Sequence, residues 1–323
     1  MGGGPSNPEL VVAGVAAGAL AFLAAAYKPA TVMRDEVQAV RARTTEPFGI
    51  NVFVPGSPTG DPSALGSYLE SLRPDADALG VPIGEPAWDD DDWDAKIATL
   101  LDLAPPVVSF TFGCPEPAVI AALQAVGSQV WITVTQEREA VLAASAGADA
   151  LCVQGTEAGA HRGTFADSPP IDVEPDLLDL VREISRLSDL PVLAAGAVMD
   201  HQGVLAALQA GALGVQCGTA FLLCPESGTS PAHRAALVDP RFTETAVTRA
   251  FSGRAARGLL NQFMRQHADA PAAYPEINNA ARPLRAAAAR VGDLDRLHLW
   301  AGTGYRAARD RPVAVVLDQL CGR

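Results

Sequence analysis

The feature that most limits how this chain can fold is a series of short apolar runs of strand length. Each run is bounded by Gly, Pro or Asp and carries apolar side chains at most of its positions. Strands that are covered on both faces, as in a parallel sheet, have this composition. Seven runs are predicted as strands: 19–25, 48–54, 107–112, 130–134, 150–153, 192–195 and 214–217.

Helical patterns separate these apolar runs. They lie at about 31–43, 93–103, 116–126, 136–146, 175–187 and 201–210. Such an alternation predicts a parallel sheet with right-handed crossovers, and 323 residues suffice for one large α/β barrel. The sequence therefore predicts an α/β fold, a TIM (β/α)8 barrel that lacks its first strand.

The alternation weakens after about Thr219, and this point divides the chain. The barrel is expected to take residues 1–220. Residues 221–305 are predicted as a small, mostly helical lobe inserted after the last strand, and residues 306–323 as a C-terminal helix that returns to the barrel.

An apolar stretch at 10–26 has the composition of a membrane segment but not its organisation. Asn7 can cap a helix that has Pro8 in its first turn, and Gly18 can end that helix. A signal peptide would begin with basic residues, whereas Glu9 stands here. We expect a short helix followed by a strand, and no membrane span.

Charge and cysteine content exclude several classes of function. The formal net charge is −13, and no cluster of five or more Lys and Arg residues occurs, so a nucleic-acid partner is not expected. Five cysteines contain no C-x-x-C pair. This argues against a disulfide framework and against a zinc site, and it favours the reducing cytoplasm.

Polar residues at the ends of the predicted strands are the candidates for a functional site, because barrel enzymes place their chemistry there. Asn51 lies inside the run 48–54, where a buried carboxamide needs hydrogen-bond partners. It is either a satisfied core residue or a hydrogen-bonding partner of a polar ring edge.

Gln154 ends the strand at 150–153 and begins a loop rich in small residues. His161 follows in this loop, and imidazole is the side chain best suited to move protons near neutral pH. We interpret His161 as a catalytic residue rather than a structural one.

The last two strand ends carry a different signal. Gly196 follows the strand 192–195. Gln216 lies within the strand 214–217, and Gly218 and Thr219 come directly after it. Barrels hold phosphate groups at these two ends, through backbone N–H groups and a helix N-terminus. These turns are therefore predicted to bind a phosphate.

Six segments give the chain a family resemblance. It resembles the nitronate monooxygenases, formerly called 2-nitropropane dioxygenases. The segments follow the order expected for the family, and they are PFGINVFVP, VVSFTFGCP, VQGTEAGAHRGTF, PVLAAGAV, GVQCGTAFLLCPES and LWAGTGYRAAR. The most specific of them is VQGTEAGAHRGTF.

The resemblance implies that the barrel binds FMN and that the protein uses O2 to oxidise alkyl nitronates, and possibly nitroalkanes, to a carbonyl compound and nitrite. His161 would match the family's active-site histidine. It would take the α-proton of a nitroalkane or hydrogen-bond the nitro oxygens of a nitronate. The residues that would hold FMN are Asn51, Gln154, Gly159, Gly196, Gln216, Gly218 and Thr219.

The chain departs from the family pattern in three places. Ala160 stands where the family usually has Gly, and Thr111 stands where many members have His. The family's first strand ends in a phrase like Ala-Pro-Met-Gly-Gly-Gly, whereas this sequence begins at Met1-Gly2-Gly3-Gly4. We therefore expect that Met1 is an internal residue of a longer natural chain, or that another segment fills the gap.

Three other functions fit parts of the pattern. The nearest is an FMN-dependent enoyl reductase that uses a pyridine nucleotide. The others are a non-catalytic flavin-binding protein and a barrel enzyme that acts on a sugar phosphate without flavin. The sequence names neither the physiological substrate nor the oligomeric state.

Overall fold

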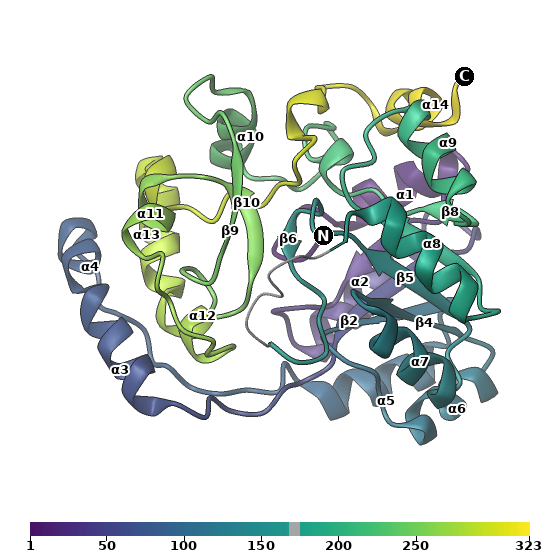
Figure 1. The fold of residues 1–323 in the computed structure, drawn as a ribbon, viewed down its shortest axis with the longest axis horizontal. Helices are drawn as coiled ribbons and strands as arrows, with labels where there is room; N and C mark the ends of the chain where they lie inside the picture. The colour runs from purple at the N-terminus through teal and green to yellow at the C-terminus, as the bar shows by residue number, and fades with distance from the viewer. Residues whose placement is uncertain (168–174) are drawn as a thin grey trace.

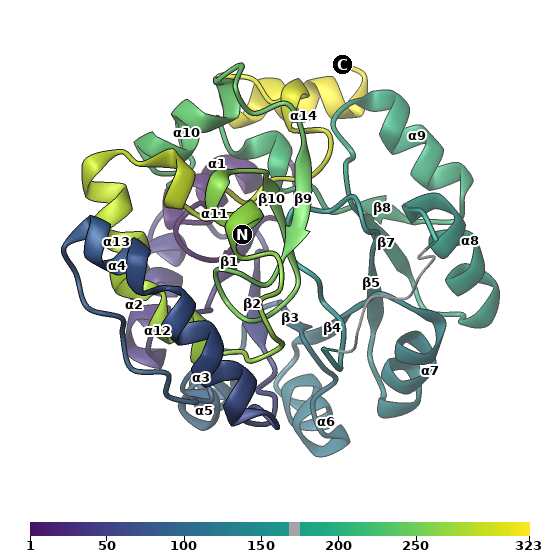
Figure 2. The ribbon, with the colours of Figure 1, turned by 60° about the vertical axis from the view of Figure 1, so that its left-hand side comes forward.

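A parallel sheet of seven strands forms the larger part of the molecule (Figures 1 and 2). The computed structural model describes residues 1–167 and 175–323. The strands pair in the order β1-β2-β3-β4-β5-β7-β8, all in parallel. They are β1 (Phe22–Ala24), β2 (Gly49–Phe53), β3 (Val107–Thr111), β4 (Gln129–Val134), β5 (Ala150–Gln154), β7 (Val192–Ala195) and β8 (Gly214–Val215). The prediction of seven parallel strands is confirmed.

Helices cover the outer side of this curved sheet, as Figure 2 shows. The last of them, α14, contacts α1 and α9, so the C-terminus returns to the barrel. The helices of the barrel are α1 (Pro8–Ala16), α2 (Ala30–Arg41), α5 (Trp93–Leu103), α6 (Pro117–Ala125), α7 (Glu137–Ala146), α8 (Leu177–Leu187), α9 (His201–Gln209) and α14 (Val313–Cys321).

The apolar stretch at 10–26 folds as the sequence predicts, into α1 and β1. The side chain of Asn7 caps α1 by accepting from Leu10 N, and Gly18 follows the helix at φ +88°. No helix in the described part of the chain is both long and apolar enough to cross a membrane.

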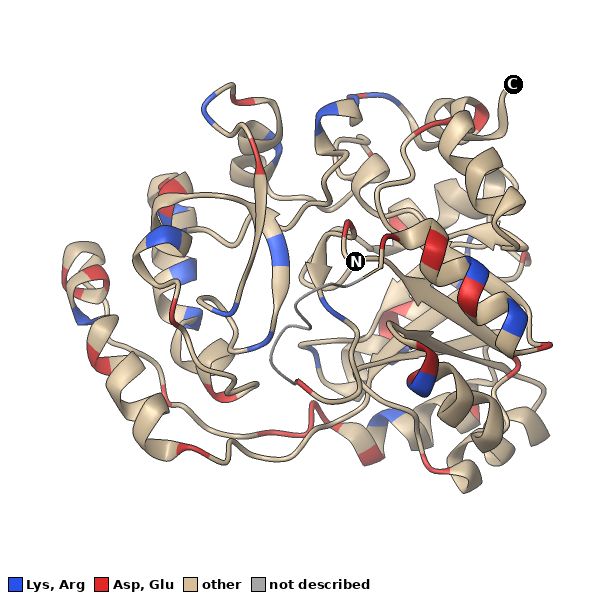
Figure 3. Ribbon diagram, in the orientation of Figure 1, with Lys and Arg blue, Asp and Glu red and all other residues tan. Residues whose placement is uncertain are grey.

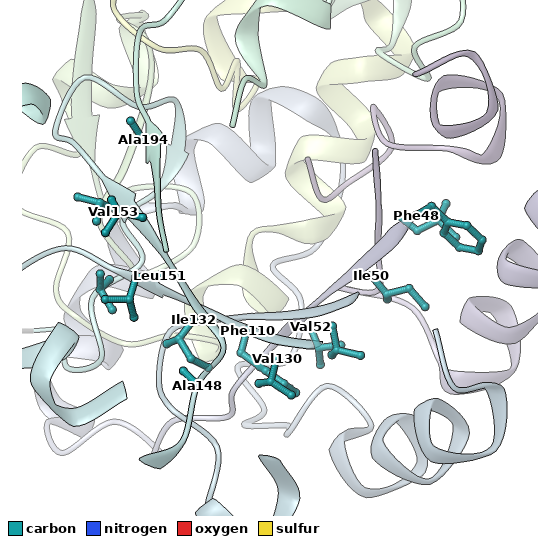
Figure 4. Close-up of a cluster of buried hydrophobic side chains, with 14 of the residues drawn as sticks. Phe48, Ile50, Val52, Phe110, Val130, Ile132, Ala148, Leu151, Val153 and Ala194 are labelled. Carbon is teal, nitrogen blue, oxygen red and sulfur yellow. The ribbon is translucent and has the colours of Figure 1, made fainter. Parts of the chain in front are cut away.

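The two faces of the sheet differ in polarity. Apolar side chains at alternate positions, including Ile50, Phe110 and Ile132, are fully buried in the barrel's main apolar cluster (Figure 4). Neighbouring strand residues point to the opposite face, which puts Asn51, Thr111 and their neighbours on the other side. One face is therefore packed, and the other carries polar groups.

The sheet has two edges, β1 and β8. The first residues of the chain lie between the carboxyl ends of these strands. A Cβ atom on Gly218 would lie 3.3 Å from the side chain of Met1, and one on Gly2 would lie 3.6 Å from Ala26.

A smaller lobe stands beside the barrel (Figure 1). It contains α10 (Pro231–Val238), α11 (Gln262–Gln266), α12 (Glu276–Ala280) and α13 (Arg282–Val291). It also contains an antiparallel sheet, in which β10 (Ala256–Leu259) pairs with β9 (Thr245–Thr248) and with β6 (Ala160–His161). The sequence predicted no strands here. In β9 and β10 polar residues are mixed with the apolar ones, so neither forms an apolar run, and β6 comes from a distant loop.

Two helices from the first half of the chain also belong to the lobe. They are α3 (Pro62–Ser71) and α4 (Arg73–Leu79), which the sequence analysis did not predict within its 1–220 barrel. Leu65 and Leu72 join the apolar cluster of Phe251 and Phe263, and Tyr68 Oη donates to Ala250 O at 2.6 Å. The lobe is therefore assembled from two separate stretches of sequence.

Candidate active site

The loop after β5 carries His161 and is held by the side chain of Gln154, at the end of that strand. The Gln154 amide Nε2 donates to His161 O at 3.0 Å, and its Oε1 accepts from Gly163 N at 2.8 Å. A Cβ atom on Gly163 would lie 2.8 Å from Thr133, so the loop passes close to β4. Gln154, expected among the residues that hold the cofactor, thus uses both ends of its amide to position the histidine loop.

Two further side chains fix the same loop. The buried carboxylate of Glu139, on α7, accepts from Thr135 N and Phe165 N, both at 2.7 Å. The Arg254 guanidinium, from the turn before β10, donates to the carbonyl oxygens of Arg162 and Thr164. The loop is therefore anchored to the barrel on one side and to the lobe on the other.

The ring of His161 lies among aromatic side chains from three parts of the chain. Ring centroids lie 5.7 Å from Phe112, 5.9 Å from Tyr274 and 5.5 Å from Trp300. Its Nε2 lies 2.8 Å from Ser252 Oγ. The imidazole is thus fixed by packing and by one hydrogen bond.

The same surroundings determine the protonation of His161. Burial, followed by the positive charges of Arg254 and Arg285, lowers the pKa of His161 from 6.5 to about 3. The ring is therefore neutral near pH 7. A neutral imidazole can offer an N–H donor on one nitrogen and a lone pair on the other.

A chain of polar groups crosses the inner face of β2, β3 and β4. Asn51 Nδ2 donates to Ser109 Oγ at 2.9 Å and to Thr111 Oγ1 at 3.0 Å, and Thr111 Oγ1 lies 3.1 Å from Thr133 Oγ1. Thr111, which stands where many relatives have His, is thus part of this chain. Within the described residues, the Oδ1 atom of Asn51 has no hydrogen-bond partner, which leaves an acceptor for a ligand.

The carboxyl ends of β7 and β8 expose backbone donors. Gly196 has φ +148°, a conformation that favours glycine. In the part of the chain that the structure describes, the N–H groups of 196–198 and 217–220 make no backbone hydrogen bond. Adjacent free N–H groups at these two strand ends are the donor set that holds a phosphate in barrels.

Three other predicted residues lie at the same end of the barrel. Gln216 Oε1 accepts from Cys152 Sγ at 2.8 Å, and Thr219 Oγ1 accepts from Gly302 N at 2.9 Å. A Cβ atom on Gly159 would lie 2.4 Å from Gly302 N. Gly159 and Thr219 therefore hold the 301–302 segment, which leads to Trp300, against the barrel.

The residues present fit a flat ring system joined to a phosphate. Free N–H groups offer the phosphate contacts, and Asn51 Oδ1 offers an acceptor to a ring edge. The sequence predicted these positions but not Ser252, Tyr274 and Trp300. Trp300 lies in the segment LWAGTGYRAAR that carried the resemblance, whereas nothing local marks the other two. Among the described residues, no group of His, Cys, Asp or Glu could hold a metal ion.

The fold and the site define a class: a barrel oxidoreductase of the flavin-dependent type, with a neutral histidine at the mouth of the barrel. Comparison with known proteins then assigns the family. The family model described as nitronate monooxygenase matches residues 1–322, and the chain belongs to that family.

Individual relatives agree with this assignment. The nitronate monooxygenase of Pseudomonas aeruginosa is 39% identical over 98% of this chain and 92% of its own length. A probable nitronate monooxygenase of Staphylococcus aureus strain Newman is 35% identical, over 98% and 90% of the two chains.

Solved structures show the same fold. Nitroalkane oxidase from Streptomyces ansochromogenes superposes with a TM-score of 0.97 at 45% identity, covering 100% of this chain and 93% of its own. The protein FabK from Thermotoga maritima is more distant, with a TM-score of 0.72 at 25% identity over 98% and 88% of the chains.

Proposed function

We propose that the protein binds FMN and uses O2 to oxidise alkyl nitronates to a carbonyl compound and nitrite. The observation that carries this proposal is the neutral His161, fixed at the mouth of the barrel beside strand ends with free N–H groups. Family membership supports the flavin and the nitronate, and the donor set supports a cofactor with a phosphate. The five cysteines are free, which fits a cytoplasmic protein.

The chain's own residues would hold FMN in two groups. Asn51 and Gln216 would contact the ring and ribityl chain, with Gln154 beneath the neighbouring loop. The turns at 196–198 and 217–220 would hold the phosphate. Bound FMN would supply the redox chemistry, by taking electrons from the nitronate and passing them to O2. The full set proposed to hold FMN, by contact or by positioning a neighbouring loop, is Asn51, Gln154, Gly159, Gly196, Gln216, Gly218 and Thr219.

His161 would contact the substrate. Its partner Ser252 lies on the Nε2 side, so Nδ1 is the ring nitrogen without a partner in the described residues. With a nitronate, an imidazole N–H would bind a nitro oxygen. With a neutral nitroalkane, a lone pair would take the α-proton. In the overall reaction the carbon–nitrogen bond would break, nitrogen would leave as nitrite, and O2 would supply the carbonyl oxygen, so that one O2 oxidises two nitronate anions.

The test of the cofactor is the visible spectrum of the purified protein, followed by denaturation and chromatography of what is released. The expected result is a yellow protein that releases FMN and not FAD. A colourless protein that takes up no added FMN would overturn the proposal and favour a sugar-phosphate enzyme.

The test of the reaction is a steady-state assay of O2 consumption and nitrite release with an alkyl nitronate. Turnover that needs NADH or NADPH and an enoyl substrate instead would favour the enoyl reductase. A yellow protein that is inactive in both assays would indicate a flavin-binding protein without this chemistry.

A further inference from the structure

Five side chains on the inner face of the sheet are joined end to end by hydrogen bonds and form what we call the polar row. It runs from β2 across β3, β4 and β5 to the end of β8, through Asn51, Thr111, Thr133, Cys152 and Gln216. Thr133 and Cys152 are opposite each other in the register of β4 and β5, and their side chains are hydrogen-bonded. The two ends, Asn51 and Gln216, are residues already proposed to hold FMN, whereas Thr133 and Cys152 have no assigned role.

The thiol of Cys152 is the link between the hydroxyl groups and the glutamine. The residue is 3% exposed, and its Sγ lies 2.8 Å from Gln216 Oε1. A carbonyl oxygen only accepts, so the thiol donates its proton to Gln216. Burial raises the pKa of Cys152 to about 12, so the group keeps this proton near neutral pH.

The direction of the remaining hydrogen bonds follows from the two ends of the polar row. Asn51 Nδ2 also donates to Ser109 O at 3.3 Å, and a carbonyl needs a donor there, so Asn51 presents an N–H to Thr111 as well. Each hydroxyl or thiol has one proton to give. Because Cys152 donates to the glutamine, Thr133 donates to Cys152 and Thr111 donates to Thr133. The opposite direction would leave the Thr111 proton with no acceptor among the described residues.

This order decides which atom of each terminal amide stays free. Asn51 keeps Oδ1, an acceptor, and Gln216 keeps Nε2, a donor, and neither atom has a partner in the part of the chain that the structure describes. The two ends of an amide have nearly the same shape, so an amide without a fixed partner turns over easily. Cys152 prevents this in Gln216, because a turned amide would bring an N–H against the S–H proton.

We propose that Cys152 is a positioning residue for the cofactor, and that it holds the Gln216 amide so that Nε2 donates to an oxygen of bound FMN. The inference rests on the proposed function for the identity of the cofactor. The ring carbonyls and the ribityl hydroxyls of FMN are both acceptors, and a donor that is already oriented needs no rearrangement when the cofactor binds. Thr111 and Thr133 keep the order of protons between Asn51 and Cys152.

The first experiment follows the release of FMN from the loaded protein on dilution, by the recovery of flavin fluorescence, and yields its dissociation constant. Cys152→Ala and Cys152→Val both remove the donor, but they differ in the space that they leave. Both should raise the dissociation constant roughly three- to ten-fold, as expected for loss of one neutral hydrogen bond. Cys152→Ser keeps a donor and should restore most of the affinity. Cys224→Ala, at a buried cysteine outside the polar row, should leave the constant unchanged.

The second experiment observes the hydrogen bond itself, through the S–H stretching band in the infrared spectrum. A thiol that donates a hydrogen bond absorbs at a lower frequency than a free thiol. The chain has five cysteines, so the band of Cys152 is identified as the one that Cys152→Ser lacks. It should lie at the frequency of a donating thiol, and Gln216→Met, which removes the acceptor, should move it to that of a free thiol. This readout does not depend on FMN.

The outcomes distinguish this inference from the proposed function. A protein that takes up no FMN overturns the proposed function and the positioning role with it, whereas the S–H band would still show whether Cys152 donates to Gln216. If FMN binds equally tightly to Cys152→Ala, Cys152→Val and the unmodified protein, the proposed function stands and the positioning role is wrong. Equal weakening in Cys152→Ser and Cys152→Ala, or a Cys152 band at the frequency of a free thiol, would also overturn it.

Discussion

At the scale of single residues, the proposed chemistry of this protein depends on how His161 is held. Its ring has one polar contact, with Ser252, and is otherwise surrounded by Phe112, Tyr274 and Trp300. Aromatic neighbours remove water without offering hydrogen bonds, so they favour the neutral imidazole. The resting ring is therefore neutral, and it can donate a hydrogen bond from one nitrogen and accept at the other.

His161→Asn tests this role. The variant keeps a polar side chain but cannot take a proton, so turnover of neutral nitroalkanes should fall by roughly a hundred- to ten-thousand-fold. Pre-formed nitronates need no proton removed and should be affected much less. The measurement is kcat/KM for both forms of one compound. Equal losses on both would assign His161 to binding or folding instead.

Stability should depend on pH in a predictable direction. Burial lowers the pKa of His161 to about 3 and that of His233 to about 4, whereas both lie near 6.5 in the unfolded chain. Between these values the unfolded state binds more protons, so stability is full above about pH 6.5 and falls as the pH is lowered towards 4. Each histidine contributes at most about 1.4 kcal/mol per pH unit.

The measurement is the thermal midpoint of the flavin-free protein between pH 7.5 and 5, beside the variant His233→Gln. The variant should lose less stability on acidification than the unmodified protein. Parallel curves would show that His233 is equally easy to protonate in the folded and unfolded states.

At the scale of elements, the proposed site depends on one loop, which is held by side chains from a strand, a helix and a turn. The loop after β5 is fixed by Gln154 at its own strand, by Glu139 on α7 and by Arg254 beside β10. Its residues 160–161 also pair with β10 as the strand β6. A loop with this many anchors keeps its histidine in one place, which catalysis by positioned groups needs.

Glu139→Ala should loosen this loop. The change leaves Thr135 N and Phe165 N without their acceptor, so the free energy of unfolding should fall by about 2–3 kcal/mol. Activity should fall as well, although Glu139 does not touch the substrate. Glu137→Ala, an exposed glutamate on the same helix, is the control for denaturant unfolding. Equal stability of the two variants would show that Glu139 does not anchor the loop.

At the scale of the whole molecule, a barrel and a lobe share one site. The barrel supplies the strand ends, and the lobe supplies Ser252, Tyr274, Arg254 and Arg285. Basic and acidic residues are spread over both parts (Figure 3), so the net charge of −13 does not collect in one patch of the ribbon. The proposed site therefore depends on the position of the lobe as well as on the barrel.

Asp75 links the two stretches of sequence that make the lobe. On α4, it accepts from His267 Nε2 at 2.9 Å and from Arg296 Nε at 2.7 Å. Asp75→Ala leaves both donors without their acceptor and should destabilise the protein by about 3 kcal/mol. Asp77→Ala, an exposed position on the same helix, should have little effect on the denaturation midpoint. If both variants unfold alike, Asp75 is not a structural link.

The sequence by itself determined the barrel, because each strand is a buried apolar run whose pattern is local. The start and end of α5, at 93 and 103, and the strand at 192–195 were predicted at the observed residues. The sequence also placed Asn51 within a strand, His161 in the loop after a strand, and the turns at Gly196 and Thr219 at strand ends, since polar residues and glycines at such places are visible without the fold.

Only the tertiary structure decided the rest, because it depends on contacts between residues far apart in the chain. The two-residue strand β6 exists because β10 pairs with it, and α3 and α4 fold onto a lobe that begins well over a hundred residues later. Ser252 and Tyr274 reach His161 only through that lobe. The charge around the site was likewise hidden in the sequence, since an acidic chain can still bring Arg254 and Arg285 close to one histidine.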